Sequence, residues 1–161
     1  AEKAREAGQC MGEALPELRD IMHKIKETYD VHKSNVGVGS TIFAVKPGDG
    51  SAREQAASCQ KVLGGWANIA NEYATKRYRS NLINWGMLPF IIDKGELPFE
   101  NGDYIFIPEI QDAIKNKVST IKAFVVNKDM KEFELKLDEL TDDERQIILD
   151  GCLINYYREN K

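Results

Sequence analysis

The sequence predicts a mixed α/β domain whose sheet is partly antiparallel. Strand-like and helix-like stretches alternate through the first hundred residues, which is typical of strand–helix–strand units. Further along, two β-rich stretches are separated by the turn sequence Asn127-Lys128-Asp129, which predicts an antiparallel hairpin. The chain has 161 residues, a length that suits one well-cored domain, so we expect residues 1–161 to form a single domain.

The amino-terminal part predicts a helix followed by a buried strand. Apolar residues recur at helical spacing from Leu15 to Tyr29, so a surface helix with one buried stripe is expected to start at Pro16. The apolar, β-branched run Thr41-Ile42-Phe43-Ala44-Val45 then predicts a buried strand, which Pro47 ends.

The stretch Gly48-Asp49-Gly50-Ser51-Ala52-Arg53-Glu54 joins this strand to a helix predicted from Ser51 to Leu63. Ser51 followed three residues later by Glu54 has the spacing of a capping box. A helix start flanked by glycine also offers free backbone N–H groups to an anion, and the planar guanidinium of Arg53 suits a carboxylate or phosphate. The residues alone leave simple capping and anion binding equally open.

The rest of the chain predicts further strands and helices in alternation. Strands are expected at 66–70, 87–92, 104–107, 118–126 and 132–137, and helices at 73–85, 108–115 and 141–157. Thr141 and Glu144 form a second capping box at the start of the last helix, and Gly151 in its middle indicates close packing against a neighbour. Lys76, Arg77 and Arg79 are expected on the outer, solvent-facing side of their helix, a basic patch that suits a small anion.

Composition and charge exclude several classes of function. The net charge of -4 and pI near 5.3 argue against nucleic acid as a main partner. No stretch approaches the roughly 20 apolar residues that a membrane span needs. The spacing of Cys10, Cys59 and Cys152 indicates neither disulfides nor a metal site, which favours a reduced, cytoplasmic location. Cys59 is expected to be buried as a small hydrophobic residue.

Three stretches in a fixed order carry a family resemblance. They are Gly48 to Ala57 with the helix end Leu63-Gly64-Gly65, Asn81 to Pro89, and Glu144 to Tyr156. Together they resemble the C-terminal swivelling domain of the aconitase family, iron–sulfur hydro-lyases that move a hydroxyl between neighbouring carbons of a tricarboxylate or related acid. The resemblance covers residues 41–157 and implies a layered β/β/α fold.

The resemblance also implies roles for the opening stretch. Ser51 matches the serine that acts as the catalytic base toward a substrate carbon, and Arg53 matches the arginine that binds substrate and supports that serine. Gly50 and Ala52, beside them, are expected to bind substrate as well. An unperturbed hydroxyl is a weak base, so amide dipoles and a guanidinium are needed to stabilise its anion.

Three positions depart from the family pattern and leave the substrate open. Many members have a second serine where this chain has Ala52, and an arginine and a histidine where it has Lys76 and Tyr78. Also missing is the threonine–aspartate strand that opens the family's domain, so we expect the chain to be part of a longer enzyme.

The resemblance places the cofactor elsewhere. A [4Fe–4S] cluster is expected on other domains, with none bound by this chain; there an open iron would act as a Lewis acid on the leaving hydroxyl. The isolated chain is therefore expected to be inactive, and its partners to be cluster-bearing domains and a small-molecule carboxylate substrate. Three alternatives remain: a free-standing small subunit of an isopropylmalate-type isomerase that binds a large subunit, a non-catalytic anion-binding module, and a structural role in which Ser51 only caps its helix.

Overall fold

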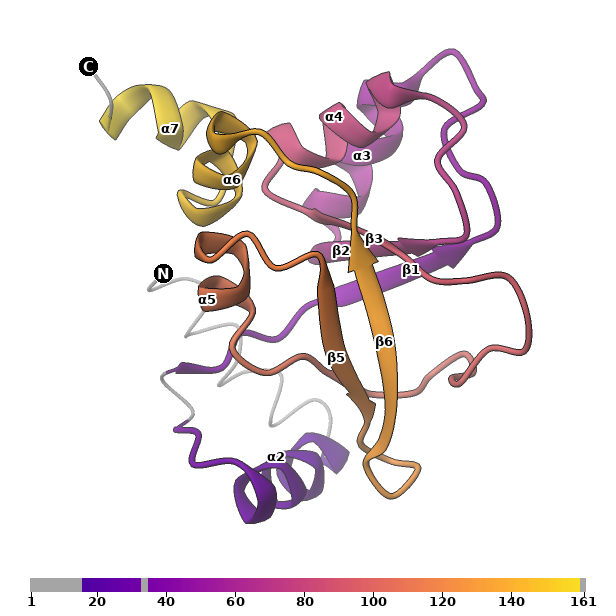
Figure 1. Cartoon of the computed structure of the whole chain (residues 1–161), viewed down its shortest axis with the longest axis vertical. Helices are drawn as coiled ribbons and strands as arrows, with labels where there is room; N and C mark the ends of the chain where they lie inside the picture. Colours follow the sequence, from indigo (N-terminus) through magenta and orange to yellow (C-terminus); the bar gives the residue numbers. More distant parts are fainter. Residues whose placement is uncertain (1–15, 33–34, 160–161) are drawn as a thin grey trace. The chain divides into compact units, whose positions relative to one another are not determined.

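The computed structural model describes residues 16–32 and 35–159 and contains a six-stranded mixed sheet (Figure 1). Its strands are β1 (Ser40–Ala44), β2 (Gly65–Ala70), β3 (Leu88–Ile91), β4 (Ile105–Phe106), β5 (Thr120–Val125) and β6 (Lys131–Leu137), in the order β1-β2-β3-β6-β5-β4. β2 pairs in parallel with both β1 and β3, whereas β3 with β6 and β4 with β5 are antiparallel. The predicted mixed, partly antiparallel α/β fold is confirmed.

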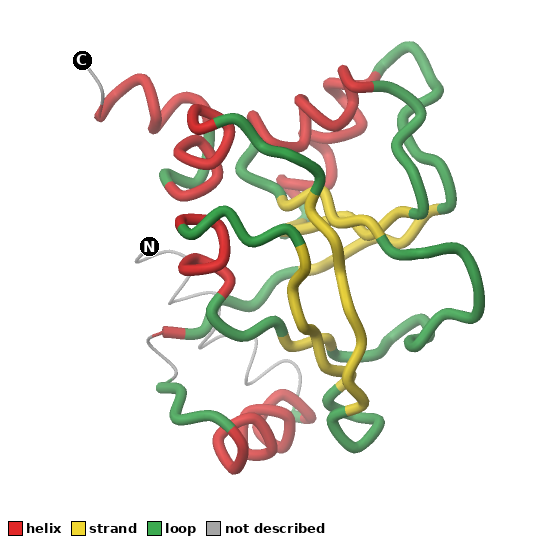
Figure 2. The backbone as a smooth tube through the Cα atoms, in the orientation of Figure 1, coloured by secondary structure: helices red, strands yellow, loops and turns green. Residues whose placement is uncertain are grey.

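The helices are α2 (Glu17–Thr28), α3 (Arg53–Val62), α4 (Lys76–Asn84), α5 (Ile110–Lys115), α6 (Asp142–Leu149) and α7 (Leu153–Glu159). Helices and strands alternate along the chain from α2 to β3, and beyond β3 the strands β3 and β4, the strands β5 and β6, and the helices α6 and α7 follow one another directly (Figure 2). The prediction of one helix over 141–157 is wrong, because Gly151 has φ +90° and breaks it into α6 and α7. The predicted close packing of Gly151 is confirmed: a Cβ on Gly86 would collide with the Gly151 carbonyl oxygen.

The described residues group into two compact units. The first combines the described part of residues 1–38 with Leu97–Ile107 and Ala123–Phe133. Its buried core consists of Ile21, Ile25, Phe106, Phe124 and Val126. The buried stripe predicted for the first helix is confirmed from Leu18 onward, while Leu15 lies outside the described residues.

The second unit contains Gly39–Glu96, Pro108–Lys122 and the described part of residues 134–161. Here β1, β2 and β3 form a parallel set, and α3 and α4, which connect them, pack side by side (Figure 1). Buried residues of the two helices form a core cluster with Met87; the cluster consists of Ala57, Tyr78, Leu82 and Met87.

β1 differs from its prediction. It lies at the end of the strand order, where β2 is its only neighbour among the described strands, and none of its residues is fully buried. Ile42 is 44% exposed. The run of apolar residues correctly indicated a strand, but a strand at a sheet edge is covered less than a central one.

α3 buries only a narrow stripe, of which Ala57 is the one fully buried residue. Cys59 is exposed, so the expectation that it is buried is wrong. Successive helix residues are about 100° apart, so a residue two positions after Ala57 faces nearly the opposite way. Along the chain that the structure describes, no helix is both long and apolar enough to cross a bilayer.

Candidate functional site

The β1–α3 loop leaves the start of its helix open. α3 begins at Arg53 with Ala52 as its N-cap, and no side chain caps it. Ser51 is exposed, and its hydroxyl makes no hydrogen bond with any residue in the described ranges. The predicted capping box of Ser51 and Glu54 is therefore wrong, and so is the expectation that the helix starts at Ser51.

The cap fails because the neighbouring side chains have other partners. Glu54 accepts a hydrogen bond through Oε1 from the indole Nε1 of Trp85, at 3.1 Å, so its carboxylate is turned toward the end of α4. The Nε of Arg53 donates to the Gly48 carbonyl at 3.1 Å. Ser51 is thus left with a free hydroxyl at a helix start whose first backbone N–H groups have no side-chain acceptor.

Gly48 holds the loop against the start of α4. Its φ of +96° is a left-handed conformation, and a Cβ there would lie 2.5 Å from the Cβ of Tyr78. The Gly48 carbonyl accepts a second hydrogen bond, from Thr75 Oγ1 at 3.3 Å. One residue earlier, the Pro47 carbonyl accepts from the Ala74 N–H at 2.9 Å. The loop is therefore tied to the start of α4.

The other side of the loop is open. Gly50, Ser51 and Ala52 are all exposed, and a Cβ on Gly50 would meet no atom within 4 Å. Arg53 is half-buried, and its terminal Nη atoms make no hydrogen bond within the described part of the chain. The loop brings together a free hydroxyl, uncapped amides and a free guanidinium edge, a combination that suits a carboxylate.

A buried polar cluster stands behind Gly48. The Tyr78 hydroxyl accepts hydrogen bonds from Gln60 Nε2 at 2.9 Å and Asn68 Nδ2 at 3.0 Å, and Asn68 is only 1% exposed. Nearby, Tyr73 donates to the Phe90 carbonyl at 3.0 Å, and burial raises the pKa of its hydroxyl, which keeps it a neutral donor. Tyr78, noted above as a departure from the family pattern, thus forms the wall that fixes the loop.

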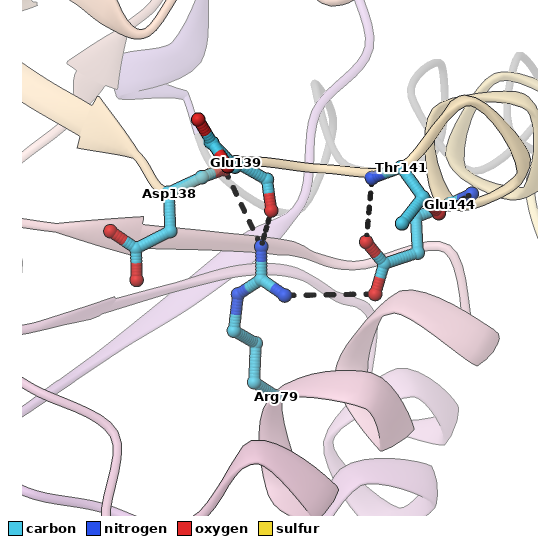
Figure 3. Close-up of polar contacts among 5 residues, drawn as sticks. All are labelled: Arg79, Asp138, Glu139, Thr141 and Glu144. Carbon is cyan, nitrogen blue, oxygen red and sulfur yellow. Dashed lines mark hydrogen bonds and ion pairs between the residues drawn. The ribbon is translucent and has the colours of Figure 1, made fainter.

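The basic patch on α4 is only partly as predicted. Lys76 and Arg77 are exposed, but the Arg79 side chain is 15% exposed. Figure 3 shows its guanidinium directed at the segment that connects β6 to α6. There Nη2 donates to the carbonyls of Asp138 at 3.4 Å and Glu139 at 3.0 Å. The expectation that Arg79 lies on the outer face is wrong, because its Nη2 atom donates to these carbonyls; its Nε is buried without a hydrogen-bond partner among the described residues.

The second capping box is confirmed. The Glu144 N–H donates to Thr141 Oγ1 at 3.2 Å, and the Thr141 N–H donates to Glu144 Oε2 at 2.9 Å (Figure 3). The other carboxylate oxygen of Glu144 lies 3.6 Å from Arg79 Nη1. The start of α6 is therefore closed by its own side chains and fastened to α4.

The two described cysteines do not form a cluster site. A [4Fe–4S] cluster that keeps one iron open needs three thiolates gathered in one place. Cys59 and Cys152 are free thiols, and Cys10 lies outside the described residues. Over residues 16–32 and 35–159, no three His, Cys, Asp or Glu side chains gather where they could hold a metal ion. Among the described residues there is no site for a cluster, and its expected position on other domains stays a prediction.

Sequence comparison assigns the family. The sequence model of the aconitase C-terminal domain matches residues 15–95, which include the whole β1-α3-β2-α4-β3 segment and its open loop. The chain belongs to the aconitase C-terminal domain family. The predicted family resemblance is thus confirmed.

Relatives of this aconitase C-terminal domain are hydratases and dehydratases. Aconitate hydratase A of Rickettsia bellii is 30% identical over 156 residues, 92% of this chain but 17% of that protein. The methanogen homoaconitase small subunit of Methanocaldococcus jannaschii is 35% identical over 116 residues, 71% of this chain and 58% of the relative. The chain therefore spans about a sixth of the first relative and somewhat more than half of the second.

A solved structure supports the fold of this aconitase C-terminal domain. The crystal structure of 3-isopropylmalate dehydratase (leuD) from Methanocaldococcus jannaschii matches with a TM-score of 0.58 and 29% identity, over 83% of this chain and 71% of that one. The predicted swivel-type fold is confirmed.

The predicted site residues of this domain are consecutive in the structure: Gly50, Ser51 and Ala52 are exposed in the loop, and half-buried Arg53 begins α3. Their roles in catalysis and substrate binding stay predictions. The sequence analysis missed Thr75 because it placed this residue inside a helix predicted at 73–85. In the structure the helix begins at Lys76, and Thr75 is its N-cap.

Proposed function

We propose that this domain supplies a serine base and a carboxylate-binding arginine to a hydro-lyase of the aconitase family. The observation that carries the proposal is the free, exposed hydroxyl of Ser51. It lies at a helix start without a side-chain cap, directly before Ala52 and two positions before Arg53 in the sequence. The rest of the active site is assigned to domains or a subunit that bear an iron–sulfur cluster.

The local chemistry supports Ser51 as the base. A serine hydroxyl gives up its proton only where its anion is stabilised, and the first N–H groups of α3 together with the positive end of the helix dipole supply that stabilisation. The alkoxide then removes a proton from a substrate carbon, while hydroxide departs from the neighbouring carbon and a C=C bond forms. The proton then returns to the carbon that lost hydroxide, and hydroxide adds to the carbon that lost the proton, so the hydroxyl group has moved to the neighbouring carbon.

Arg53 is suited to hold the substrate while this occurs. Its Nε is fixed by the Gly48 carbonyl, so the guanidinium plane has a defined orientation and its two terminal nitrogens remain for a carboxylate. The backbone N–H groups beside Gly50 and Ala52 are proposed to bind the same group. We assign the stabilisation of the departing hydroxide to groups outside this chain. The isolated domain is therefore expected to be inactive.

The substrate class and partner follow from the same argument. A site with a guanidinium and helix amides favours a small hydroxy acid with at least one carboxylate beside the reacting carbons. The partner is either the remainder of a long chain, as in the aconitate hydratase relative, or a separate large subunit. The second arrangement is supported by the homoaconitase relative, itself named a small subunit. A cytoplasmic location is proposed because a reducing compartment keeps Cys59 and Cys152 as thiols.

The test replaces Ser51 with alanine in the complete enzyme, meaning this chain together with the cluster-bearing domains or subunit. Turnover of aconitate or 3-isopropylmalate is expected to fall about 10²–10⁴-fold, the usual contribution of a positioned proton-transfer group, with the visible absorption of the cluster unchanged. Ser58→Ala is the matched control, since Ser58 lies on α3, just after the loop, and its hydroxyl donates to the Gln55 carbonyl. Near-normal turnover of Ser51→Ala would sink the proposal.

Calorimetry separates the alternative of a non-catalytic module. Tight binding of the same acids by the isolated chain favours a self-sufficient anion-binding site, whereas binding that needs the partner agrees with a shared active site.

A further inference from the structure

Thr75 lies far from Ser51 in sequence, yet its side chain reaches the Ser51 loop. It is the N-cap of α4, where its Oγ1 accepts a hydrogen bond from the Tyr78 N–H at 3.2 Å. The same oxygen donates its proton to the Gly48 carbonyl at 3.3 Å. A hydroxyl can donate once while it accepts, so a single side chain serves both the helix and the loop.

The carbonyl that Thr75 holds is also the one that orients Arg53. Gly48 O accepts from Thr75 Oγ1 and from Arg53 Nε, at 3.1 Å, and these two bonds occupy both of its lone pairs. If the Gly48 carbonyl turned away, Arg53 would lose its only hydrogen bond among the described residues. The orientation of this one peptide group therefore controls the direction of the guanidinium.

Gly48 needs such a restraint. Glycine reaches many backbone conformations at little cost, so its peptide can rotate unless it is held. Tyr78 blocks one side of the residue, where even a Cβ would lie 2.5 Å from the Tyr78 Cβ. The Ala74 N–H fixes the preceding carbonyl, that of Pro47, at 2.9 Å. Thr75 supplies the remaining restraint, on the Gly48 carbonyl itself.

We propose that Thr75 is a positioning residue for the Ser51 loop. Its hydroxyl holds the Gly48 carbonyl in place. As a result, the terminal nitrogens of Arg53 and the hydroxyl of Ser51 both point at the substrate. The proposal rests on the proposed function of Ser51 and Arg53. A displacement of about 1 Å in a reacting group can lower a rate about 10²-fold, so loss of this single bond is expected to be measurable in turnover.

Three variants of Thr75 separate its two bonds. Thr75→Ser keeps both the donor and the acceptor. Thr75→Asp keeps an acceptor for the Tyr78 N–H, and so caps α4, but has no proton for Gly48. Thr75→Val removes both bonds. Thr141→Val is the matched control, because Thr141 also caps a helix through its hydroxyl but lies at α6, with the Glu144 N–H as its donor.

The experiment measures kcat, KM and melting temperature for these variants in the complete enzyme, with aconitate or 3-isopropylmalate as the substrate and Ser51→Ala as the reference. Thr75→Asp and Thr75→Val are expected to lower kcat/KM about 10–100-fold, with a raised KM as well as a lowered kcat, and Thr75→Ser to restore it. Thr141→Val is expected to lower the melting temperature as Thr75→Val does and to leave kcat/KM within about twofold, since a lost cap alone affects only stability.

Different failures have different meanings. If Thr75→Asp keeps wild-type kcat/KM while Ser51→Ala is inactive, the hydrogen bond to Gly48 has no positioning role and the proposal is overturned, although Ser51 remains the base. If Thr141→Val lowers kcat/KM as much as Thr75→Val, cap loss explains both and the proposal is again overturned. If Ser51→Ala itself keeps normal turnover, the proposed function fails first.

Discussion

The starts of α3 and α6 have the same sequence signature and opposite structures. Ser51 precedes Glu54, and Thr141 precedes Glu144, by three residues. At α6 both hydrogen bonds of a capping box form. At α3 neither forms, and the N-cap position is taken by Ala52. The pattern alone therefore does not decide whether a helix start is closed.

Tertiary partners account for the difference. Glu144 faces Arg79, whose guanidinium stabilises the Glu144 carboxylate. In this position the carboxylate also accepts a hydrogen bond from the Thr141 N–H. Glu54 instead accepts from Trp85 Nε1 across the gap between α3 and α4. The start of α6 satisfies its N–H groups with its own side chains, whereas the start of α3, whose glutamate pairs with Trp85, leaves its first N–H groups without a side-chain acceptor among the described residues.

The largest expected effect comes from closing the open helix start. Ala52→Asp places a carboxylate at the N-cap of α3, where it accepts from the backbone N–H groups and raises stability by about 1 kcal/mol. The same carboxylate competes with substrate and disfavours an alkoxide at Ser51, so kcat/KM of the complete enzyme is expected to fall about 10²-fold or more. Thermal melting and steady-state kinetics measure the two effects.

Ala56→Asp is the control for Ala52→Asp, because it adds the same charge one turn further along the exposed side of α3. It is expected to change kcat/KM far less. Equal losses in the two variants would mean that overall charge, and not the helix start, limits the reaction.

A smaller effect is expected from changing the cation while its charge is kept. Arg53→Lys retains a positive charge but loses the planar fork and the Nε bond to Gly48. Hydrogen bonds to charged groups contribute about 1.5–3 kcal/mol, so KM is expected to rise about 10–100-fold. Arg77→Lys, on an exposed arginine of α4, should leave KM unchanged, and a KM unaffected by Arg53→Lys would exclude a substrate contact there.

The smallest effect concerns the two glutamates. Glu144→Ala opens the capping box of α6 and removes the carboxylate that faces Arg79, so the free energy of unfolding is expected to fall by about 1–2 kcal/mol. Glu54→Ala removes one exposed hydrogen bond to Trp85 and is expected to lower the free energy of unfolding by about 0.5 kcal/mol or less. Urea denaturation of the isolated chain measures both values. Equal losses would mean that α3 depends on a closed start as much as α6 does.

The strands, the hairpin and the loop that carries Ser51 could be predicted from the sequence, because they depend on local patterns and on an ordered set of motifs. The errors have a common physical cause in contacts between distant segments. The indole of Trp85 decides the orientation of Glu54, and carbonyls after β6 decide that of Arg79. Thr75 was missed because the predicted helix included it, and because no local pattern shows its hydrogen bond to the Gly48 carbonyl, which lies two elements earlier in the chain.

The contact between Gly86 and Gly151 has a consequence for how this sequence can vary. The Gly151 carbonyl occupies the place that the first side-chain carbon of any other residue at position 86 would need. Even alanine at position 86 would act as a wedge between the end of α4 and the turn that joins α6 to α7. In a library of random variants selected only for folding, position 86 should therefore keep glycine more strictly than most positions of the apolar core, where one hydrophobic side chain can often replace another.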